Sequence, residues 1–366
     1  MKFPNKYLRN LKPYKLASHK IWSVNSDQRN EILKLDWNEA TIPPSPIVRK
    51  RIDKILDDPC FFNLYPTTYN DELMTLLSEY VGLPKDNLQY FASSDALHEY
   101  ICKVFISVGD PVMILGPSYD NFRLTCQANG AEVFFTYYNN DFTFSPDKFE
   151  TEINRIEPAV VYICNPNNPT GNVHQQSYIE HLLNEFPDTL FLLDEAYYEF
   201  SGITCKDLVL KYDNLLISRT MSKAFALANF RVGYLIGSKD NVQFVNRIRN
   251  PKNLTTFAQE AACGALSDTK YMWAYVEEVH KAKEEFRKDL ENYSDKFKVI
   301  NGHGNFLMLK FPNYEEKSKL LDYLAEQNIF VRDTTQADCV KSCFRITIGT
   351  REQMKRVIKV LTSYYD

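Results

Sequence analysis

Glycine is scarce in this sequence, and the shortage excludes two common kinds of nucleotide site. The chain has 12 glycines among 366 residues, about 3% against an average near 7%. No subset of them spells G-x-G-x-x-G or G-x-x-x-x-G-K-[ST], the loops that cradle phosphates in dinucleotide-binding and P-loop proteins. Any phosphate site in this chain would have to be built from other residues.

Several other features are missing as well. The 43 basic and 47 acidic side chains nearly balance, so there is no basic surface for nucleic acid or an anionic membrane. The longest apolar runs are too short to span a bilayer. Eight cysteines form no C-x-x-C pair, six histidines form no H-E-x-x-H, and the first 15 residues contain no apolar signal core. We therefore expect a cytoplasmic, reduced protein with no metal, nucleic acid or membrane partner.

Short apolar runs recur between about residues 90 and 240, each ending in a polar or Gly/Pro cluster. Their apolar residues are continuous rather than alternating, which is typical of strands buried on both faces of a parallel sheet. Most runs are followed by a segment of helical period, so the pattern indicates an α/β fold. The clearest runs cover 111–115, 132–137, 159–164, 190–193, 215–218 and 234–237.

The pattern changes after residue 237. A proline-free stretch over 256–293, rich in Ala, Glu and Lys, predicts a long helical stretch that links two domains. Beyond it we expect strands at 304–311, 329–332 and 343–348, with helices near 315–327 and 351–365, as a smaller α+β domain. The resulting division is an N-terminal segment over the candidate site (1–30), a large domain (31–245) and a small domain (246–366).

Polar residues follow four of the expected strands, at 116–119, 165–171, 194–197 and 219–223. Ligands of open α/β sheets bind at the carboxyl ends of the strands. The functional site is therefore expected among these residues.

Five segments in order resemble motifs of the fold type I pyridoxal 5'-phosphate (PLP) aminotransferases, specifically the histidinol-phosphate aminotransferase family. The resemblance spans nearly the whole chain. It implies a mostly parallel seven-stranded sheet between helices plus a smaller α+β domain. The segments are LKPY at 11–14, NPNNPTG at 165–171, DEAYYEF at 194–200, SRTMSKAFALANFRVGY at 218–234 and RITIGT at 345–350.

The resemblance gives Lys223 the role of the lysine that forms a Schiff base with PLP, and makes Lys223, Asp194 and Tyr197 the catalytic residues. A lysine after a buried strand is desolvated, which favours the neutral amine that this bond needs. Asp194 would keep the pyridine nitrogen of PLP protonated, although Asp-Glu after a strand also occurs in magnesium sites. Tyr197 and Asn168 would bind the phenolic oxygen of the ring; Asn-Pro is also a common turn signal.

The cofactor phosphate is expected at the start of a helix that begins with Ser94 and Asp95, with Ser222 and Arg231 as further donors. The family commonly has Gly-Ala-Asp-Glu at this turn, whereas this chain has Ser93-Ser94-Asp95-Ala96. Serine can still cap the helix and donate. We therefore expect phosphate binding to persist with altered local geometry.

Two tyrosines complete the expected cofactor site. Tyr119 resembles the aromatic residue that stacks on the PLP ring. Tyr65 resembles the tyrosine that reaches the cofactor phosphate of the neighbouring subunit, so the resemblance implies a homodimer. Packing in the core is the alternative for both side chains.

Arg332 and Arg345 lie on successive expected strands of the small domain, and both match arginines of the family. Guanidinium groups suit carboxylate and phosphate, and the resemblance makes these arginines hold the anionic end of the substrate. Tyr14, Asn38 and Asn168 would assist. A structural ion pair is the alternative for the arginines.

The resemblance implies transfer of an amino group from a donor such as glutamate to a phosphorylated keto acceptor. Trp37 and the Ser93-Ser94 pair depart from the family pattern. They favour a small phosphorylated ketone such as dihydroxyacetone phosphate over imidazole acetol phosphate. An O-phospho amino acid decarboxylase with the same residues is the main alternative. A PLP-binding regulator is disfavoured, because about 30 residues precede the expected catalytic fold and the net charge is -4.

Overall fold

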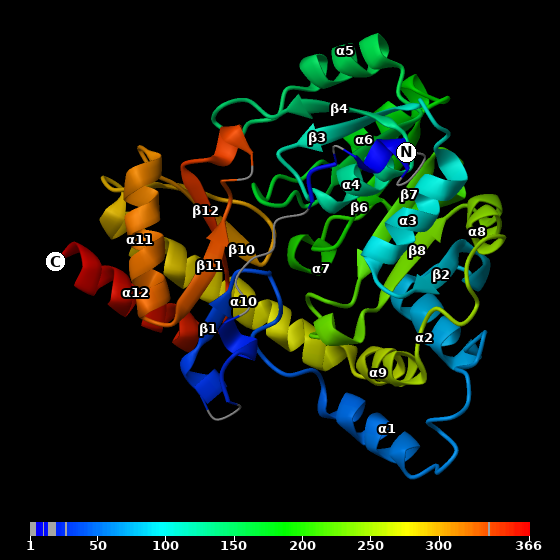
Figure 1. The fold of residues 1–366 in the computed structure, drawn as a ribbon, viewed down its shortest axis with the longest axis horizontal. Helices are drawn as coiled ribbons and strands as arrows, with labels where there is room; N and C mark the ends of the chain where they lie inside the picture. The colour runs from blue at the N-terminus through cyan, green and yellow to red at the C-terminus, as the bar shows by residue number, and fades with distance from the viewer. Residues whose placement is uncertain (1–4, 10, 14–19, 26–27, 336) are drawn as a thin grey trace.

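Two β-sheets of different size organise the protein (Figure 1). The structure is a computed structural model that describes residues 5–9, 11–13, 20–25, 28–335 and 337–366. The larger sheet and its helices occupy one side of Figure 1, and the smaller sheet occupies the other. The long helix α10 (Thr269–Leu290) starts near the lower edge of the larger unit and runs behind the smaller sheet, and the C-terminus lies at the outer end of the smaller unit.

Seven strands form the larger sheet in the order β2-β8-β7-β6-β5-β3-β4. Strand β8 is antiparallel to its neighbours β2 and β7, whereas the other neighbouring pairs are parallel. This confirms the mostly parallel seven-stranded sheet. The strands are β2 (Leu88–Phe91), β3 (Pro111–Gly116), β4 (Glu132–Tyr137), β5 (Val160–Cys164), β6 (Leu190–Asp194), β7 (Leu215–Thr220) and β8 (Gly233–Gly237).

Five of the six continuous apolar runs are buried as expected, whereas the run over 132–137 forms the edge strand β4, in which Thr136 is the one buried residue. Every residue of β5, β7 and β8 is buried, so helices must cover both faces of the sheet. The helices of this part are α1 (Pro46–Leu56), α2 (Asp71–Val81), α3 (Ser94–Phe105), α4 (Asn121–Ala128), α5 (Pro146–Ile156), α6 (Gln176–Glu185), α7 (Tyr198–Ser201) and α8 (Lys239–Asn246).

The smaller sheet has the order β1-β11-β12-β10-β9. Strand β1 is parallel to β11, and the remaining pairs are antiparallel. Residues 33–35 therefore belong to the smaller sheet, although the predicted large domain begins at residue 31. The division into segments 1–30, 31–245 and 246–366 otherwise stays a prediction. The elements are β1 (Leu33–Leu35), β9 (Lys298–Ile300), β10 (Phe306–Lys310), β11 (Ile329–Asp333), β12 (Cys343–Thr347), α11 (Tyr314–Glu326) and α12 (Arg351–Tyr365).

The helical stretch expected over 256–293 is helical in the structure, with one break. The segment forms α9 (Thr256–Leu266) and α10, followed by a 3-10 turn at Glu291–Tyr293. Asp268 leaves helical geometry, with φ -133° and ψ 54°, and its carboxylate accepts a hydrogen bond from Ser45 Oγ at 2.6 Å. The break between the two helices is thus in contact with the N-cap of α1.

The structure adds one observation on membranes: within the residues that it describes, it contains no helix that combines the length and the apolar character needed to cross a bilayer.

Candidate active site

The carboxyl ends of three central strands lie side by side. Cys164 at the end of β5 pairs with Asp194 on β6, and Asp194 pairs with Ser218 on β7. On the far side of β7, Phe91 of β2 and Thr220 both pair with Gly233. The loops that carry the predicted site residues therefore begin at one edge of the sheet.

The backbone at the start of α3 lies very close to Gly233. A Cβ atom on Gly233 would lie 2.4 Å from the backbone nitrogen of Ser94 and 2.5 Å from the carbonyl carbon of Ser93. Ser93 has φ 90° and caps the helix, since its Oγ accepts a hydrogen bond from the backbone nitrogen of Ala96 at 3.2 Å. The close approach holds Ser94 and Asp95, the first two residues of α3, beside β8.

Asp95 links three side chains around this helix start. Its carboxylate accepts hydrogen bonds from Arg231 Nη2 at 3.0 Å, from the hydroxyl of Tyr119 at 3.0 Å and from Asn121 Nδ2 at 3.2 Å. Arg231 and Tyr119, which are distant in the sequence, are thus brought together at the predicted phosphate position. The expected stacking of Tyr119 on a cofactor ring stays a prediction.

The donors at this position suit a phosphate. The amides of Ser94 and Asp95 stand at the positive end of a 12-residue helix and have no partner inside it. Ser222 is buried, and its backbone nitrogen and Oγ both bond to Thr220 Oγ1. Two helix amides, a hydroxyl and the guanidinium of Arg231 make a donor set that fits a doubly charged anion.

Asp194 is a buried carboxylate with two hydrogen-bond donors. Its Oδ2 accepts from the hydroxyl of Tyr162 at 2.7 Å, and its Oδ1 accepts from the backbone nitrogen of Ala196 at 3.2 Å. The side chain lies at the carboxyl end of β6. This chemistry fits the predicted partner of a protonated ring nitrogen, because an ionised carboxylate inside a protein needs donors and a cationic partner.

Tyr197 contacts a segment from the smaller sheet. Its hydroxyl accepts a hydrogen bond from Asn38 Nδ2 at 3.1 Å. The Oγ1 of Thr347 on β12 lies 3.0 Å from both the backbone nitrogen and the Oδ1 of Asn38, which fixes the amide. Burial raises the pKa of Tyr197 above its usual range, so the phenol stays protonated and can donate to a ligand.

Arg345 connects the smaller sheet with the loop after β5. Its Nη1 donates to Asn168 Oδ1 at 2.5 Å, and its Nη2 donates to the carbonyl of Asp36 at 2.6 Å. Arg332 is directly opposite Arg345 in the β11–β12 ladder, and opposite residues project from the same face of a sheet. The two predicted arginines therefore share one face of the smaller sheet.

Lys223 lies between the two sheets. Its Nζ donates to the carbonyl of Trp37 at 2.8 Å and is 5.7 Å from the centre of the Tyr197 ring. Burial, together with the positive charge of Arg345, lowers the pKa of Lys223 from 10.5 to about 8. The neutral amine, which is the nucleophilic form, is therefore far more abundant than on an exposed lysine.

One predicted residue lies apart from this group, and another lies outside the described residues. Tyr65 is 81% exposed, in the segment between α1 and α2, and Lys252 Nζ lies 4.2 Å from its ring centre. Tyr14 lies outside the described residues, so its predicted role stays untested.

Sequence reasoning missed three contacts. It assigned no role to Tyr162, which the register brings to Asp194, or to Thr347, which holds Asn38. Trp37 was expected to act through its bulk, whereas its carbonyl accepts from Lys223. A hydroxyl inside the apolar run 159–164 was the one available signal for Tyr162.

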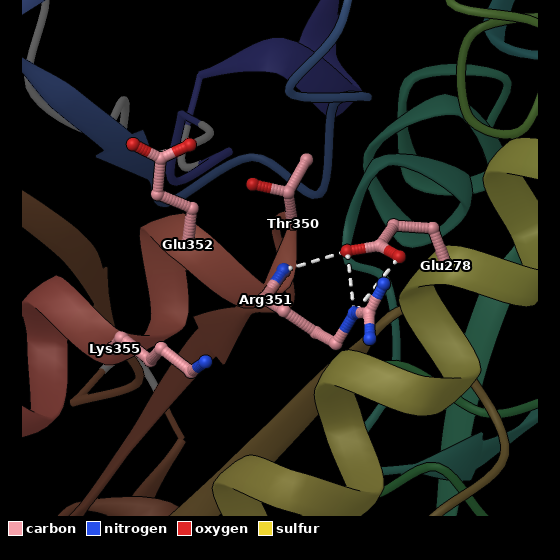
Figure 2. A pocket seen from close by; sticks show the side chains of 5 residues that line it. All are labelled: Glu278, Thr350, Arg351, Glu352 and Lys355. Atoms are coloured by element: carbon pink, nitrogen blue, oxygen red, sulfur yellow. Dashed lines mark hydrogen bonds and ion pairs between the residues drawn. The ribbon is translucent and has the colours of Figure 1, made fainter.

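A separate hollow of about 430 Å³ lies beside α10 and α12 (Figure 2). Figure 2 shows Arg351 bonded to Glu278, and Arg351 Nη1 is also 3.8 Å from Glu285. None of the predicted site residues lines it; the lining residues are Glu278, Thr350, Arg351, Glu352 and Lys355. Over the part of the chain that the structure describes, no group of three or more His, Cys, Asp or Glu side chains could hold a metal ion.

Comparison with known proteins agrees with this arrangement. A family model described as aminotransferase class I and II matches residues 30–361. The chain is 40% identical over 363 residues to a dihydroxyacetone phosphate transaminase of Campylobacter jejuni, covering 98% of this chain and 96% of that protein. It is 36% identical over 332 residues to a histidinol-phosphate aminotransferase of Ruminiclostridium cellulolyticum, covering 90% and 91%.

The fold also matches solved structures. The histidinol-phosphate aminotransferase of Sinorhizobium meliloti, in complex with PLP, superposes with a TM-score of 0.86 at 21% identity, covering 100% of this chain and 99% of that one. The enzyme of Clostridium acetobutylicum gives a TM-score of 0.82 at 24% identity, covering 91% and 99%. Together with the family match, these findings confirm the resemblance and the fold: the chain belongs to the class I and II aminotransferases and is a PLP-dependent aminotransferase.

Proposed function

We propose that this aminotransferase transfers an amino group from an amino acid, in the first place glutamate, to a small phosphorylated ketone of the dihydroxyacetone phosphate type. The relative of 40% identity in Campylobacter jejuni carries dihydroxyacetone phosphate in its name. A second relative, at 36% identity, is a histidinol-phosphate aminotransferase, so imidazole acetol phosphate is the competing acceptor.

The groups around Lys223 support the choice of a small acceptor. The peptide of Trp37 contacts the amine directly, and Lys34 Nζ lies 4.4 Å from the centre of the Trp37 ring. Lys34 is in turn paired with Asp36 at 2.8 Å and with Glu39. The backbone of Trp37 and the charges of Glu39 and Lys34 therefore act directly on the amine, and a polar, charged surrounding of this kind favours a compact phosphorylated substrate over one that carries an imidazole ring.

The residues that would hold PLP are those that surround the start of α3 and the ends of β5, β6 and β7. The phosphate would bind to the amides of Ser94 and Asp95, to Ser222 and to Arg231, with Tyr65 of a second subunit as a further partner. Asp194 would pair with the ring nitrogen, Tyr119 would stack on the ring, and Tyr197 and Asn168 would bind its phenolic oxygen.

PLP, when bound, supplies an aldehyde that accepts the amino group and an aromatic ring that withdraws electrons from the substrate. Lys223 Nζ would take the proton from the α-carbon of the amino donor and later deliver a proton to the carbonyl carbon of the acceptor. A pKa of about 8 lets this nitrogen both accept and release a proton near neutral pH. Asp194 would hold the proton of the ring nitrogen throughout.

The substrate anion would bind to Arg345 and Arg332, because both side chains project from one face of the smaller sheet. Arg345 would meet the carboxylate of glutamate in one half-reaction and the phosphate of the acceptor in the other. Asn38 and, from the N-terminal segment, Tyr14 would complete the enclosure.

A homodimer would explain an apolar surface in the segment between α1 and α2. Phe62 is 74% exposed, Leu64 is 64% exposed, and Tyr65 is adjacent. Clustered exposed apolar side chains of this kind mark contact surfaces. The free state of all eight cysteines fits a reducing compartment, and we propose that the enzyme is cytoplasmic.

A test of the substrate separates the two half-reactions. Enzyme loaded with PLP and mixed with glutamate alone should form about one 2-oxoglutarate per site. Acceptors are then compared: dihydroxyacetone phosphate, dihydroxyacetone and imidazole acetol phosphate. We expect kcat/KM to be highest for dihydroxyacetone phosphate and to fall about 100-fold or more without the phosphate, because an arginine then loses its charged partner.

A matched pair of variants examines the role of Trp37. Trp37→Ser should improve the use of imidazole acetol phosphate relative to dihydroxyacetone phosphate, whereas Trp273→Ser, at an exposed tryptophan of α10, should not. Preference of the unaltered enzyme for imidazole acetol phosphate would refute the small acceptor. Release of carbon dioxide from O-phosphoserine, without 2-oxoglutarate from glutamate, would favour the decarboxylase instead.

A further inference from the structure

A buried tyrosine stands directly behind Asp194. Tyr162 lies in the middle of β5 and pairs with Leu192 of β6. Asp194 is two residues further along β6, so both side chains project from the same face of the sheet. The hydroxyl of Tyr162 reaches diagonally across the ladder and donates to Asp194 Oδ2 at 2.7 Å.

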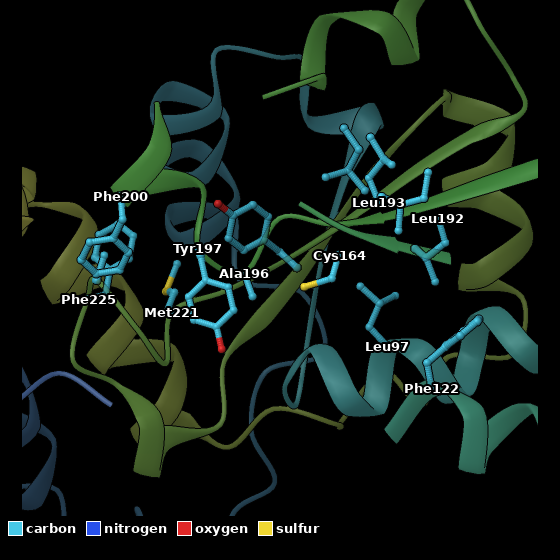
Figure 3. Close-up of a cluster of buried hydrophobic side chains, with 14 of the residues drawn as sticks. Leu97, Phe122, Cys164, Leu192, Leu193, Ala196, Tyr197, Phe200, Met221 and Phe225 are labelled. Atoms are coloured by element: carbon cyan, nitrogen blue, oxygen red, sulfur yellow. The ribbon is translucent and has the colours of Figure 1, made fainter. Parts of the chain in front are cut away.

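The ring of Tyr162 is held on two sides. It stacks on Phe122 of α4, with ring centres 4.7 Å apart and an angle of 17° between the planes. The imidazole of His98 on α3 meets it edge-on at 5.8 Å, and His98 Nε2 bonds to Ser218 Oγ at 2.9 Å. Figure 3 shows Phe122, Leu192 and Cys164 within this packed cluster of side chains. The hydroxyl therefore has little freedom to choose another partner.

Four titratable groups beside Asp194 are uncharged near neutral pH, whereas Lys223, whose charge acts on Cys164, has a pKa of about 8 and is largely protonated. Burial raises the pKa of Tyr162, of Cys164 on the paired strand and of Tyr197 in the following loop. Burial lowers the pKa of His98, although Asp194 and Asp95 oppose this. Tyr162 is thus a neutral donor that stays protonated, and no cation among these four groups balances the carboxylate.

We propose that Tyr162 is a positioning residue for the cofactor: its hydroxyl holds the Asp194 carboxylate in the orientation that the ring nitrogen of PLP requires. This inference rests on the proposed role of Asp194. A carboxylate that loses one of two donors in a dry site is protonated more readily and can rotate about its last bond. Both changes weaken its hold on a cationic ring.

The dissociation constant of PLP, measured by dialysis of the full-length enzyme at a series of pH values, tests this role without relying on turnover. Tyr162→Phe removes one oxygen atom. We expect it to weaken PLP binding about 10-fold at neutral pH. We also expect the loss of PLP on acidification to begin about one pH unit higher than in the unaltered enzyme.

Tyr138→Phe is the matched control. Tyr138 is also buried, and its hydroxyl bonds to His174 Nε2 at 3.0 Å instead of to a carboxylate. It should leave the pH dependence of PLP release unchanged. Phe122→Leu loosens the ring of Tyr162 but keeps its hydroxyl. It should raise the pH at which PLP is lost on acidification (the acid limb), as Tyr162→Phe does, but by a smaller amount.

Each result is decisive. An unchanged pH dependence in Tyr162→Phe, or an equal change in Tyr138→Phe, overturns the inference. If Tyr162→Phe does not fold, an unchanged acid limb in Phe122→Leu overturns it as well. Asp194→Asn distinguishes the role of Asp194 from the role of Tyr162. If this variant binds PLP normally, the proposed role of Asp194 is wrong. If Asp194→Asn loses PLP and Tyr162→Phe does not, only the proposed role of Tyr162 is wrong.

Discussion

Replacement of Arg345 by glutamine tests whether the charges of the site prepare Lys223 for chemistry. Lowering the pKa of Lys223 from 10.5 to about 8 makes the neutral amine about 300-fold more abundant at neutral pH, since each pKa unit is a factor of ten. Burial is the larger cause and the charge of Arg345 the second. We expect Arg345→Gln to raise this pKa by about one unit, on the order of 1.4 kcal/mol.

The rate at which an amine-reactive reagent labels Lys223 in cofactor-free enzyme reports this pKa directly. Labelling is followed over a series of pH values by mass spectrometry of the peptide. Lys281 on α10, with a side chain 55% exposed, serves as the internal control in each sample and should be labelled at the same rate in both proteins. The reasoning is refuted if Lys223 titrates together with Lys281 in the unaltered enzyme, or if Arg345→Gln leaves the midpoint of Lys223 unchanged.

Three further predictions concern backbone, stability and assembly. Gly233→Ala adds a Cβ 2.4 Å from the nitrogen of Ser94; urea unfolding should show a loss of about 1–3 kcal/mol, and PLP binding should weaken. Burial raises the pKa of Glu199 to about 7, so folding takes up a proton and the stability that this proton provides is lost as pH rises through 7. Between about pH 5 and 8 the unaltered enzyme should therefore lose up to about 2.5 kcal/mol relative to Glu199→Gln; a constant difference would contradict this. Phe62→Asp with Leu64→Asp should give a monomer in sedimentation analysis, and a persistent dimer would contradict the proposed contact surface.

Much of the larger sheet could be predicted from apolar runs alone. The six runs between 111 and 237 all became strands. Five of them are buried, as a continuous apolar run predicts, and the sixth is the edge strand β4. Strand β2 was missed: it has four residues, and its second position is Gln89. The three-residue strands β1 and β9 carry too little pattern to detect.

Long-range contacts could not be predicted in this way. Asp268, at the break between α9 and α10, is bonded to Ser45, which is far away in the sequence. The bond from Tyr162 to Asp194 requires the register of β5 on β6, and register is a property of the assembled sheet. Sequence motifs therefore predicted the site residues, whereas the hydrogen-bond partners of those residues depend on the tertiary structure.

The pairing of β1 with β11 has a mechanical consequence for the enzyme. Trp37 and Asn38 follow β1 directly and bond to Lys223 and Tyr197 of the larger unit. A rigid-body displacement of the smaller sheet therefore pulls both bonds at the same moment. Opening of the site would therefore break the Lys223 and Tyr197 bonds together. The same movement that admits a substrate would also change the burial of Lys223 and its contact with the charge of Arg345, which set its pKa.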